Sequence, residues 1–480
     1  MSEAQTARWS DLFAPSHRSV VVALAAGAFL FAVNVYLTTT IAPSLVSDIG
    51  GVALYAWTTT VFVFTALIGS TCAAVMLSAA GPRWAYRSGM IAIIVGTILC
   101  AVAPTMSVFL IGRLVQGFGS GLVYALAFAL IRETLPPTLW PRASGMLSAM
   151  YGIATIVGPA IGGLAAQFGL WRIAFWVLVP VALYFLTIGA RRLPRRAAVS
   201  STSRVPVISI VLLAVGVFVI AGASVSATAG INVAGIIAAI VIFAGWLVYE
   251  RLSGGRILPV ETFSRRSPLG AYYVTMVLLV IASTVEVFVP YFAQHLQMLG
   301  ALAAGYFGAA MAAGWSAGSM LLNGAQARRG LVMQLGPVIS AVGLILLVIF
   351  AAQHSESAVI IVAVILGLVL LGWGVGMVWP HLVNGVLTSA SERSEEIAGS
   401  SISTIQLVAT AAGSAIAGLI TNLGGLTTPG GISGAHNAAR LLFAIFLIAP
   451  LVALPVIAVA TRQHRRTAIA AEAIEGGEAA

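Results

Sequence analysis

Long apolar segments recur from one end of this 480-residue chain to the other, and they constrain its fold more than any other feature. A helix of about 20 apolar residues spans the hydrocarbon core of a bilayer. Only 8% of the residues are charged and 60% are hydrophobic, whereas a soluble chain carries about 25% charged residues. So few charges cannot cover a surface in water. We therefore expect an all-α, polytopic membrane protein, which excludes a soluble enzyme, a secreted scaffold and a disordered chain.

Fourteen apolar segments are long enough to cross a membrane. An even number of spans places both termini on the same side. The predicted spans are residues 19–42, 54–79, 88–104, 106–130, 144–167, 172–190, 206–224, 231–249, 268–292, 300–322, 331–351, 357–380, 397–420 and 438–461.

The longest connections, residues 191–205 and 250–267, are rich in arginine and flank two of the spans. They predict two six-helix bundles with two extra central helices between them. The expected divisions are an N-terminal six-helix bundle (1–190), a linker with two extra transmembrane helices (191–267), a C-terminal six-helix bundle (268–461) and a cytoplasmic tail (462–480).

All 24 basic residues are arginines, and the net charge is +10. With the N-terminus inside the cell, 21 of them fall in cytoplasmic segments, Arg172 and Arg440 face outward, and Arg113 lies within a span. Cytoplasmic loops of membrane proteins carry such an excess of arginine and lysine. We therefore expect both termini in the cytoplasm, and the basic excess does not indicate binding to nucleic acid.

The fourth span carries an arginine and several glycines on one face. Arg113, Gly117 and Gly121 are spaced i, i+4, i+8. An arginine in hydrocarbon costs about 2.5–3.5 kcal/mol on insertion scales and usually faces water or a partner, while glycines let a second helix approach closely. The alternative is a packing stripe whose arginine reaches outward to the membrane surface.

The fifth span is predicted to be tightly packed and able to bend. Ala154, Gly158 and Gly162 form a stripe of small residues, and Gly163 follows it. Pro159 removes a backbone hydrogen bond and favours a bend. A plain packing motif explains the same spacing.

Glu286 is the one acidic residue that lies clearly within a predicted span, about 9 Å from its outer end. Burial disfavours the charged form of a carboxyl group, which suits this residue to carry a proton. The alternative is a structural acid near the interface. Asn34 and Arg113 are predicted at a similar depth, so we hypothesise one polar layer in which protonation of Glu286 makes and breaks its pairing with them.

Aromatic and amide side chains within the spans are candidates for contact with an amphipathic substrate, although interfacial belts explain many tryptophans and tyrosines. No histidine or cysteine cluster predicts a metal, and a chain without lysine cannot carry a Walker motif for ATP. No cofactor is expected. The candidate substrate contacts are Tyr36, Trp57, Gln116, Tyr151, Tyr291, Trp315 and Gln406.

Two motifs in this order resemble the major facilitator superfamily: the Arg-x-x-Gln-Gly-x-Gly run that begins at Arg113, and the Gly-Pro-x-x-Gly-Gly run that begins at Gly158. The resemblance covers essentially the whole chain, and the two extra spans are similar to the 14-helix drug/proton antiporter branch. The second motif resembles the signature of these antiporters at Gly145, Gly158, Pro159, Gly162 and Gly163, with Ala154 where glycine is usual.

The chain departs from that branch at two acidic positions. Asn34 stands where the first helix usually carries an aspartate. In the loop after the second helix, which the resemblance links with conformational control, Gly81 and Arg83 match but Ser78 replaces an aspartate. Two acids commonly linked with proton coupling are therefore missing from the N-terminal half.

The resemblance implies a secondary active transporter that exports hydrophobic drugs or similar small molecules across a bacterial cytoplasmic membrane, driven by a proton gradient. Its expected partners are a hydrophobic or amphipathic substrate, protons and membrane lipids, and a monomer is expected. An exporter of an endogenous lipid, sugar or metabolite is the alternative within transport. A polytopic membrane enzyme and a channel are the alternatives of other classes.

Overall fold

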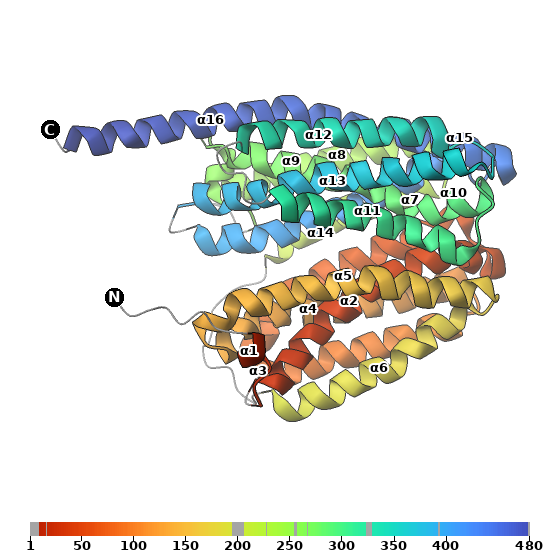
Figure 1. Cartoon of the computed structure of the whole chain (residues 1–480), viewed down its shortest axis with the longest axis horizontal. Coiled ribbons are helices and arrows are strands. Elements are labelled where there is room, and N and C mark those ends of the chain that lie inside the picture. Colours follow the sequence, from red (N-terminus) through yellow and green to blue (C-terminus); the bar gives the residue numbers. More distant parts are fainter. Residues whose placement is uncertain are drawn as a thin grey trace. The chain divides into compact units, whose positions relative to one another are not determined.

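The computed structural model describes residues 9–15, 17–193, 206–226, 228–253, 257–265, 267–322, 329–391 and 394–478. These residues form helices joined by short turns, and no strand occurs among them (Figure 1). The chain divides into two units: Met1–Val205 with Gly300–Ala309 (unit 1), and Pro206–Leu299 with Ala310–Ala480 (unit 2). Each unit is described by itself.

Unit 1 contains the first six predicted spans. The helix α3 consists of two helices that meet at Gly81, whose positive φ of 78° is a conformation that glycine adopts freely. Pro82 follows it, and the break separates the second and third spans. The helices are α1 (Trp9–Leu12), α2 (Arg18–Ile49), η1 (Val52–Leu54), α3 (Trp57–Val102), α4 (Met106–Thr134), η2 (Pro137–Leu139), α5 (Trp140–Gln167) and α6 (Trp171–Arg192).

Unit 2 contains the other spans, and two of them are interrupted by a turn of a different helix type. Its elements are α7 (Val207–Ser224), α8 (Ala229–Leu252), η3 (Val260–Phe263), α9 (Leu269–Ser283), η4 (Thr284–Val287), α10 (Val289–His295), α11 (Ala301–Leu322, which begins in the range of unit 1), α12 (Arg329–Leu346), η6 (Leu347–Ala351), α13 (Ala358–Ser389), α14 (Glu395–Leu423), α15 (Gly431–Phe446) and α16 (Ile448–Glu478).

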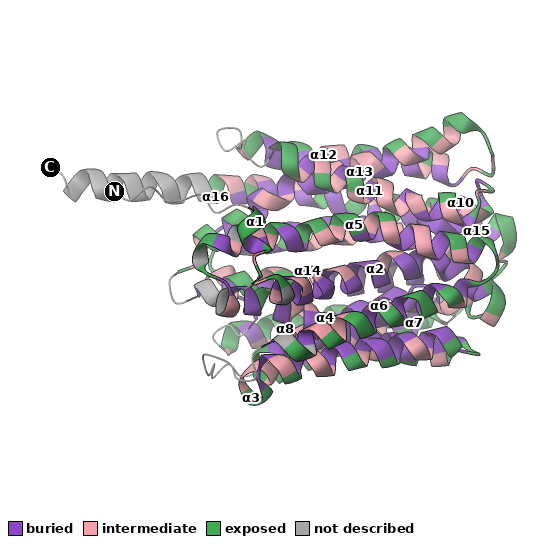
Figure 2. Ribbon diagram, turned by 60° about the horizontal axis from the view of Figure 1, so that its bottom comes forward, coloured by how far each residue is buried: buried purple, intermediate pink, exposed green. Residues whose placement is uncertain are grey.

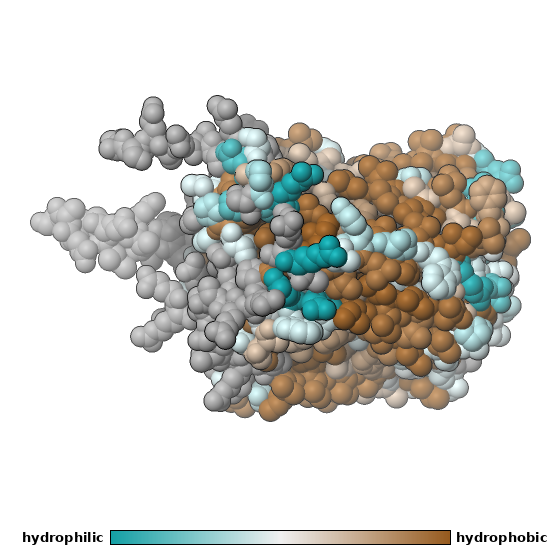
Figure 3. Space-filling view, turned by 90° about the horizontal axis from the view of Figure 1, so that it is seen from below, coloured by the Kyte–Doolittle hydropathy of each residue, from teal (hydrophilic) through white to brown (hydrophobic). Residues whose placement is uncertain are grey.

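The prediction of fourteen spans is confirmed. Twelve helical stretches are long and apolar enough to cross a membrane. The stretch that contains α3 counts as two spans because of the break at Gly81, and α11 supplies the remaining one. Hydrophobic side chains cover most of the described surface on the face shown in Figure 3. The chain is therefore a multi-pass membrane protein.

The two extra helices are part of unit 2. Helices α7 and α8 pack against each other, and α7 also packs along α14. The side-chain amide of Asn422 on α14 donates a 2.8 Å hydrogen bond to the carbonyl of Ser224 at the end of α7. The segment predicted as a linker between bundles thus contributes a packed helix pair to unit 2.

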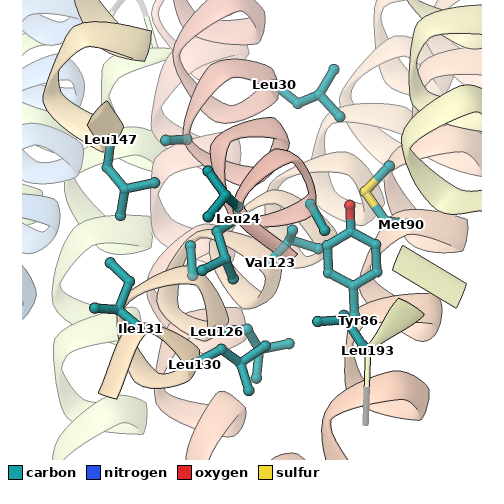
Figure 4. Packing of buried hydrophobic residues seen from close by; sticks show 14 of the residues in the cluster. Leu24, Leu30, Tyr86, Met90, Val123, Leu126, Leu130, Ile131, Leu147 and Leu193 are labelled. Atoms are coloured by element: carbon teal, nitrogen blue, oxygen red, sulfur yellow. The ribbon is translucent and has the colours of Figure 1, made fainter. Parts of the chain in front are cut away.

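Close packing of α3 on α4 forms the centre of unit 1. A Cβ atom added at Gly117 or Gly121 would collide with the carbonyl oxygens of Phe62 and Ala66, respectively. At one end of the unit, leucines of α2 and α4 pack with Tyr86 and Met90 of α3 (Figure 4). Helix α2 lies inside this packing and is largely buried (Figure 2).

A polar clasp joins three helices at the other end of unit 1. The guanidinium of Arg172 pairs with Asp48 at 2.5 Å and donates to the carbonyl of Ala103 at 3.0 Å. The indole of Trp171 donates to the same carboxylate at 3.1 Å. Arg172, which the sequence places in an outward-facing segment, thus forms an ion pair with Asp48.

Replacing Arg172 with methionine is expected to lower the free energy of unfolding by about 1 kcal/mol or less, because half-exposed ion pairs contribute little. The side chain of Arg172 is 38% exposed and that of Asp48 is 48% exposed. Thermal unfolding of the purified protein measures the change, and high salt should shrink it. Arg440→Met, which removes an exposed arginine from α15, is the control. A loss above 3 kcal/mol would contradict this account of the clasp.

Candidate functional site

A buried polar network in unit 1 surrounds Arg113. Its side chain is fully buried on α4. Nε donates to the carbonyl of Thr58 at 2.9 Å, and Nη1 donates to Oε1 of Gln116 at 2.5 Å. The guanidinium carbon lies 3.9 Å from the ring centre of Phe62, a cation–π contact. Arg113 is therefore held inside the helix packing and does not reach outward to the membrane surface.

Gln116 connects Arg113 to two further helices. Its Nε2 donates to Oδ1 of Asn34 on α2 at 2.6 Å and to Oγ1 of Thr97 on α3 at 2.9 Å. Asn34 in turn donates to the carbonyl of Leu30 at 2.8 Å. The structure thus brings Asn34 and Arg113 together. Gln116, predicted to line a substrate cavity, has a fully buried side chain that is engaged at both ends, so its contact with substrate stays a prediction.

Arg113 contributes the one formal charge among the described members of this network; its partners are amide, hydroxyl and backbone groups. A buried charge is tolerated when hydrogen bonds replace the water that it has lost. Asn34, a neutral amide, accepts from Gln116 and adds no negative charge. The described network is therefore cationic.

Replacing Gln116 with leucine is expected to lower the free energy of unfolding by about 2 kcal/mol, because it leaves buried polar groups on Asn34, Thr97 and Arg113 unsatisfied. Chemical unfolding of the purified protein measures the loss. Gln406→Leu is the matched control, since the Gln406 side chain is partly exposed and no hydrogen bond from it is found in the described residues. Equal stabilities of the two variants would refute the bridging role.

Glu286 lies in unit 2 at an interruption of a membrane-spanning helix. The 3₁₀ turn η4 (Thr284–Val287) separates α9 from α10, and Pro290 lies in the first turn of α10. The glutamate side chain is partly exposed. Within the part of the chain that the structure describes, no hydrogen bond or ion pair to its carboxyl group is found. A carboxyl group in this setting can exchange a proton without breaking a structural bond.

The helical segment that contains Glu286 is longer than predicted. It continues to His295 rather than ending at residue 292. Glu286 lies roughly 13 Å from that helix end at a rise of 1.5 Å per residue. Discontinuous helices near the bilayer midplane form the substrate and ion sites of many transporters.

Glu286 is not the one acid within a helical span, as the sequence had suggested. Helix α8 extends to Leu252, so Glu250 lies inside it and is fully buried. Its carboxylate accepts hydrogen bonds from the Ser209 hydroxyl and from the backbone amides of Ile257 (2.9 Å) and Leu258 (3.3 Å). Glu250 therefore holds Ile257 and Leu258 against α8 and α7, whereas no structural contact of this kind is found for Glu286 in the described residues.

Helices α9 and α14 run in parallel beside each other. The hydroxyls of Tyr273 and Ser401 are hydrogen-bonded near one end. Further along, a Cβ atom at Gly413 would lie 3.3 Å from Cα of Ile281. In this register Gln406 lies along α14 between the two contacts. Glu286 follows Ile281 and therefore lies beyond the second contact, so Gln406 and Glu286 are not at the same level along the helices.

The predicted aromatic contacts separate into several environments. Tyr151 packs against Tyr124 of α4, which the sequence analysis did not single out, while Trp315 packs against Trp379 at 5.5 Å between ring centres. Tyr36 and Trp57 are partly exposed. Tyr291 is only 7% exposed and stacks on His295 with 4.0 Å between ring centres; its contact with substrate stays a prediction.

The motif residues of α5 serve packing in unit 1. A Cβ atom at Gly158 would lie 2.8 Å from Cβ of Tyr36, and one at Gly162 would lie 2.9 Å from the Leu37 carbonyl. A Cβ atom added at Gly163 would lie 2.6 Å from Cα of Leu302. Pro159 lies inside the helix, and Gly145 is exposed near its start.

In the loop within α3, Arg83 forms the main contacts. Its Nε donates to the carbonyl of Leu193 at 2.9 Å, and Nη2 donates to that of Arg191 at 3.3 Å. These are carbonyls at the end of α6, where the helix dipole favours a cation. Ser78 is partly exposed and, in the described residues, bonds only to the nearby Val75 carbonyl at 3.0 Å. Arg83 thus joins the Gly81 break to the end of α6.

Comparison with known proteins identifies relatives over most of the chain. The family model of the Major Facilitator Superfamily matches residues 24–418. A probable multidrug-efflux transporter of Mycobacterium tuberculosis is 36% identical over 470 residues, which cover 94% of this chain and 96% of that protein. Multidrug resistance protein 3 of Bacillus subtilis is 28% identical over 174 residues, 36% of this chain and 34% of the relative.

Solved structures share the fold at low sequence identity. A nucleoside transporter, NupG, superposes with a TM-score of 0.64 at 11% identity and covers 92% of this chain and 99% of its own. A peptide transporter in complex with alafosfalin has a TM-score of 0.67 at 13% identity, with coverages of 92% and 95%. At such identities the likeness concerns the fold alone.

Proposed function

The chain belongs to the Major Facilitator Superfamily, and from that premise we propose that it is a secondary active transporter that exports hydrophobic or amphipathic small molecules, drugs included, in exchange for protons. Its relatives of 36% and 28% identity are named for multidrug efflux and multidrug resistance. It works as a monomer in a bacterial cytoplasmic membrane, with both termini in the cytoplasm, and needs no cofactor beyond the proton gradient.

The observation that carries proton coupling is Glu286. This carboxyl group lies in a break of a membrane-spanning helix and has no described partner. A protonated, neutral glutamate and an ionised one differ strongly in their preference for a dry environment. Proton binding at Glu286 therefore biases the two states of an alternating-access cycle. Its pairing with Arg113 or Asn34 during that cycle stays a prediction.

The neutral partners of Arg113 support a second candidate within transport. No carboxylate occurs in the described part of the Arg113 network, so unit 1 offers a cationic drug no counter-charge there. An uncharged endogenous lipid, sugar or metabolite suits that environment as well as an uncharged drug does.

Efflux from cells tests the proposed function. Bacteria that lack their own major pumps are loaded with a fluorescent drug, and its loss is followed with and without overproduced protein. We expect overproduction to speed efflux several-fold and a protonophore to abolish the gain. Efflux that is faster but indifferent to the protonophore would exclude proton exchange, and no gain for any drug would favour the endogenous substrate.

A further inference from the structure

Five aromatic side chains from four helices of unit 1 form an aromatic cluster: Phe31 of α2, Phe62 of α3, Tyr124 and Phe128 of α4, and Tyr151 of α5. Phe31 and Tyr124 are stacked, with ring centres 5.2 Å apart and planes inclined by 20°. Tyr151 meets Tyr124 edge to face at 5.8 Å, and Phe62 lies 5.6 Å from Phe31. Phe62 also contacts Arg113, whereas the other four rings take no part in the Arg113 network.

Burial divides the cluster into a closed side and an open side. Phe31 and Phe62 are buried, whereas Tyr124 and Tyr151 are partly exposed and Phe128 is 43% exposed. The accessible side therefore consists of two phenols and a phenyl ring. Such a surface offers an aromatic ligand both stacking and edge-to-face contacts, worth about 0.5–1.5 kcal/mol per ring pair beyond the area buried.

The phenol pair adds one directional group. Tyr124 and Tyr151 lie side by side, with ring centres 5.8 Å apart. Where two phenols meet, one hydroxyl can donate to the other, and the accepting hydroxyl keeps its own hydrogen. Such a hydrogen can be donated to a ligand atom that accepts a hydrogen bond.

The charge near the cluster is positive. Arg113 lies over the Phe62 ring at 3.9 Å, and its hydrogen-bond partners are neutral. Aromatic faces attract cations by themselves, but here a buried cation already occupies one of them, so a positively charged ligand gains little.

We propose that Tyr124 and Tyr151 determine substrate specificity by binding uncharged, planar aromatic compounds that carry a hydrogen-bond acceptor such as a ring carbonyl. This inference rests on the proposed export function and names the substrate class for it. The rings of the aromatic cluster select planarity, the free phenol hydrogen selects the acceptor, and Arg113 disfavours cations.

Binding to the purified full-length protein tests this assignment. The probes are an uncharged coumarin dye, which is planar and carries a carbonyl, naphthalene, which lacks the acceptor, and N-methylquinolinium, which adds a positive charge. In fluorescence titrations the double variant Y124F/Y151F is expected to raise the Kd of coumarin about fivefold, the loss of one hydrogen bond, and to leave naphthalene unchanged. Tyr124→Leu is expected to weaken both.

Tyr184→Phe is the matched control, because Tyr184 is 61% exposed on α6 and outside the cluster; it should change neither Kd. Absence of saturable coumarin binding, an unchanged coumarin Kd in Y124F/Y151F, or tighter binding of N-methylquinolinium than of coumarin would each overturn the proposal. The titration uses no proton gradient, so a negative binding result does not argue against proton-driven export. Conversely, efflux that does not depend on the proton gradient would not argue against the binding result.

Discussion

Replacing Glu286 with glutamine is expected to abolish uphill export while leaving substrate binding intact. Glutamine keeps the size of the side chain but cannot release a proton, so the two protonation states that drive the cycle collapse into one. In inverted membrane vesicles with an imposed pH gradient, accumulation of a fluorescent drug should fall at least tenfold. Downhill exchange of the same drug should persist, because the neutral side chain mimics the protonated glutamate.

Glu356→Gln provides the control for this experiment, since Glu356 is an exposed acid between η6 and α13. It should transport as the wild type does. If Glu286→Gln still concentrates drug against its gradient, Glu286 does not carry the coupled proton. If the variant also loses drug binding, the glutamate contacts substrate rather than protons.

Replacing Gly121 with valine is expected to prevent stable folding of unit 1. A Cβ atom at this position would overlap the backbone of Ala66, and backbone cannot move aside as a flexible side chain can. Overpacking typically costs about 1–3 kcal/mol and occasionally more, and the two added methyl groups put this site at the upper end. We expect little protein to be recovered from membranes, with a melting temperature lowered by many degrees.

Gly245→Val is the matched substitution on α8. Nothing lies within 4 Å of a Cβ atom at Gly245, and the residue is exposed. Both glycines lie inside helices, so the helix-propensity change is the same. Yield and melting temperature should stay near those of the wild type for Gly245→Val; equal damage from both substitutions would mean that close packing of α3 on α4 is not what Gly121 provides.

Much of the fold follows from helix-length arithmetic. The fourteen spans, the break at Gly81 and the glycine face of α4 are all visible as patterns within one segment. Helix ends were less predictable: α2 continues through Pro43, past the predicted end at residue 42, to Ile49. Asp48, in this extension, contacts Trp171 and Arg172 on α6, and the pattern within α2 gives no sign of these distant partners.

For the candidate site, too, contacts within one helix could be predicted from the sequence, whereas contacts between distant segments could not. The i, i+3 spacing of Arg113 and Gln116 already places them on one helix face, but the hydrogen bond from Gln116 to Asn34 spans 82 residues and depends on packing of α2 against α4. Tyr124 follows Gly121 by three residues on the predicted packing face, a signal that could have identified it. The burial of Glu250 could not be foreseen, because two of its partners are backbone amides of a later turn.

Proton movement driven by substrate tests the central claim most directly. Purified protein is placed in liposomes that contain a pH-sensitive dye, and a substrate gradient is imposed with equal pH on both sides. We predict that substrate flux moves protons in the opposite direction, seen as a pH change that Glu286→Gln abolishes and Glu356→Gln retains. Substrate flux of normal rate without any pH change would contradict the account.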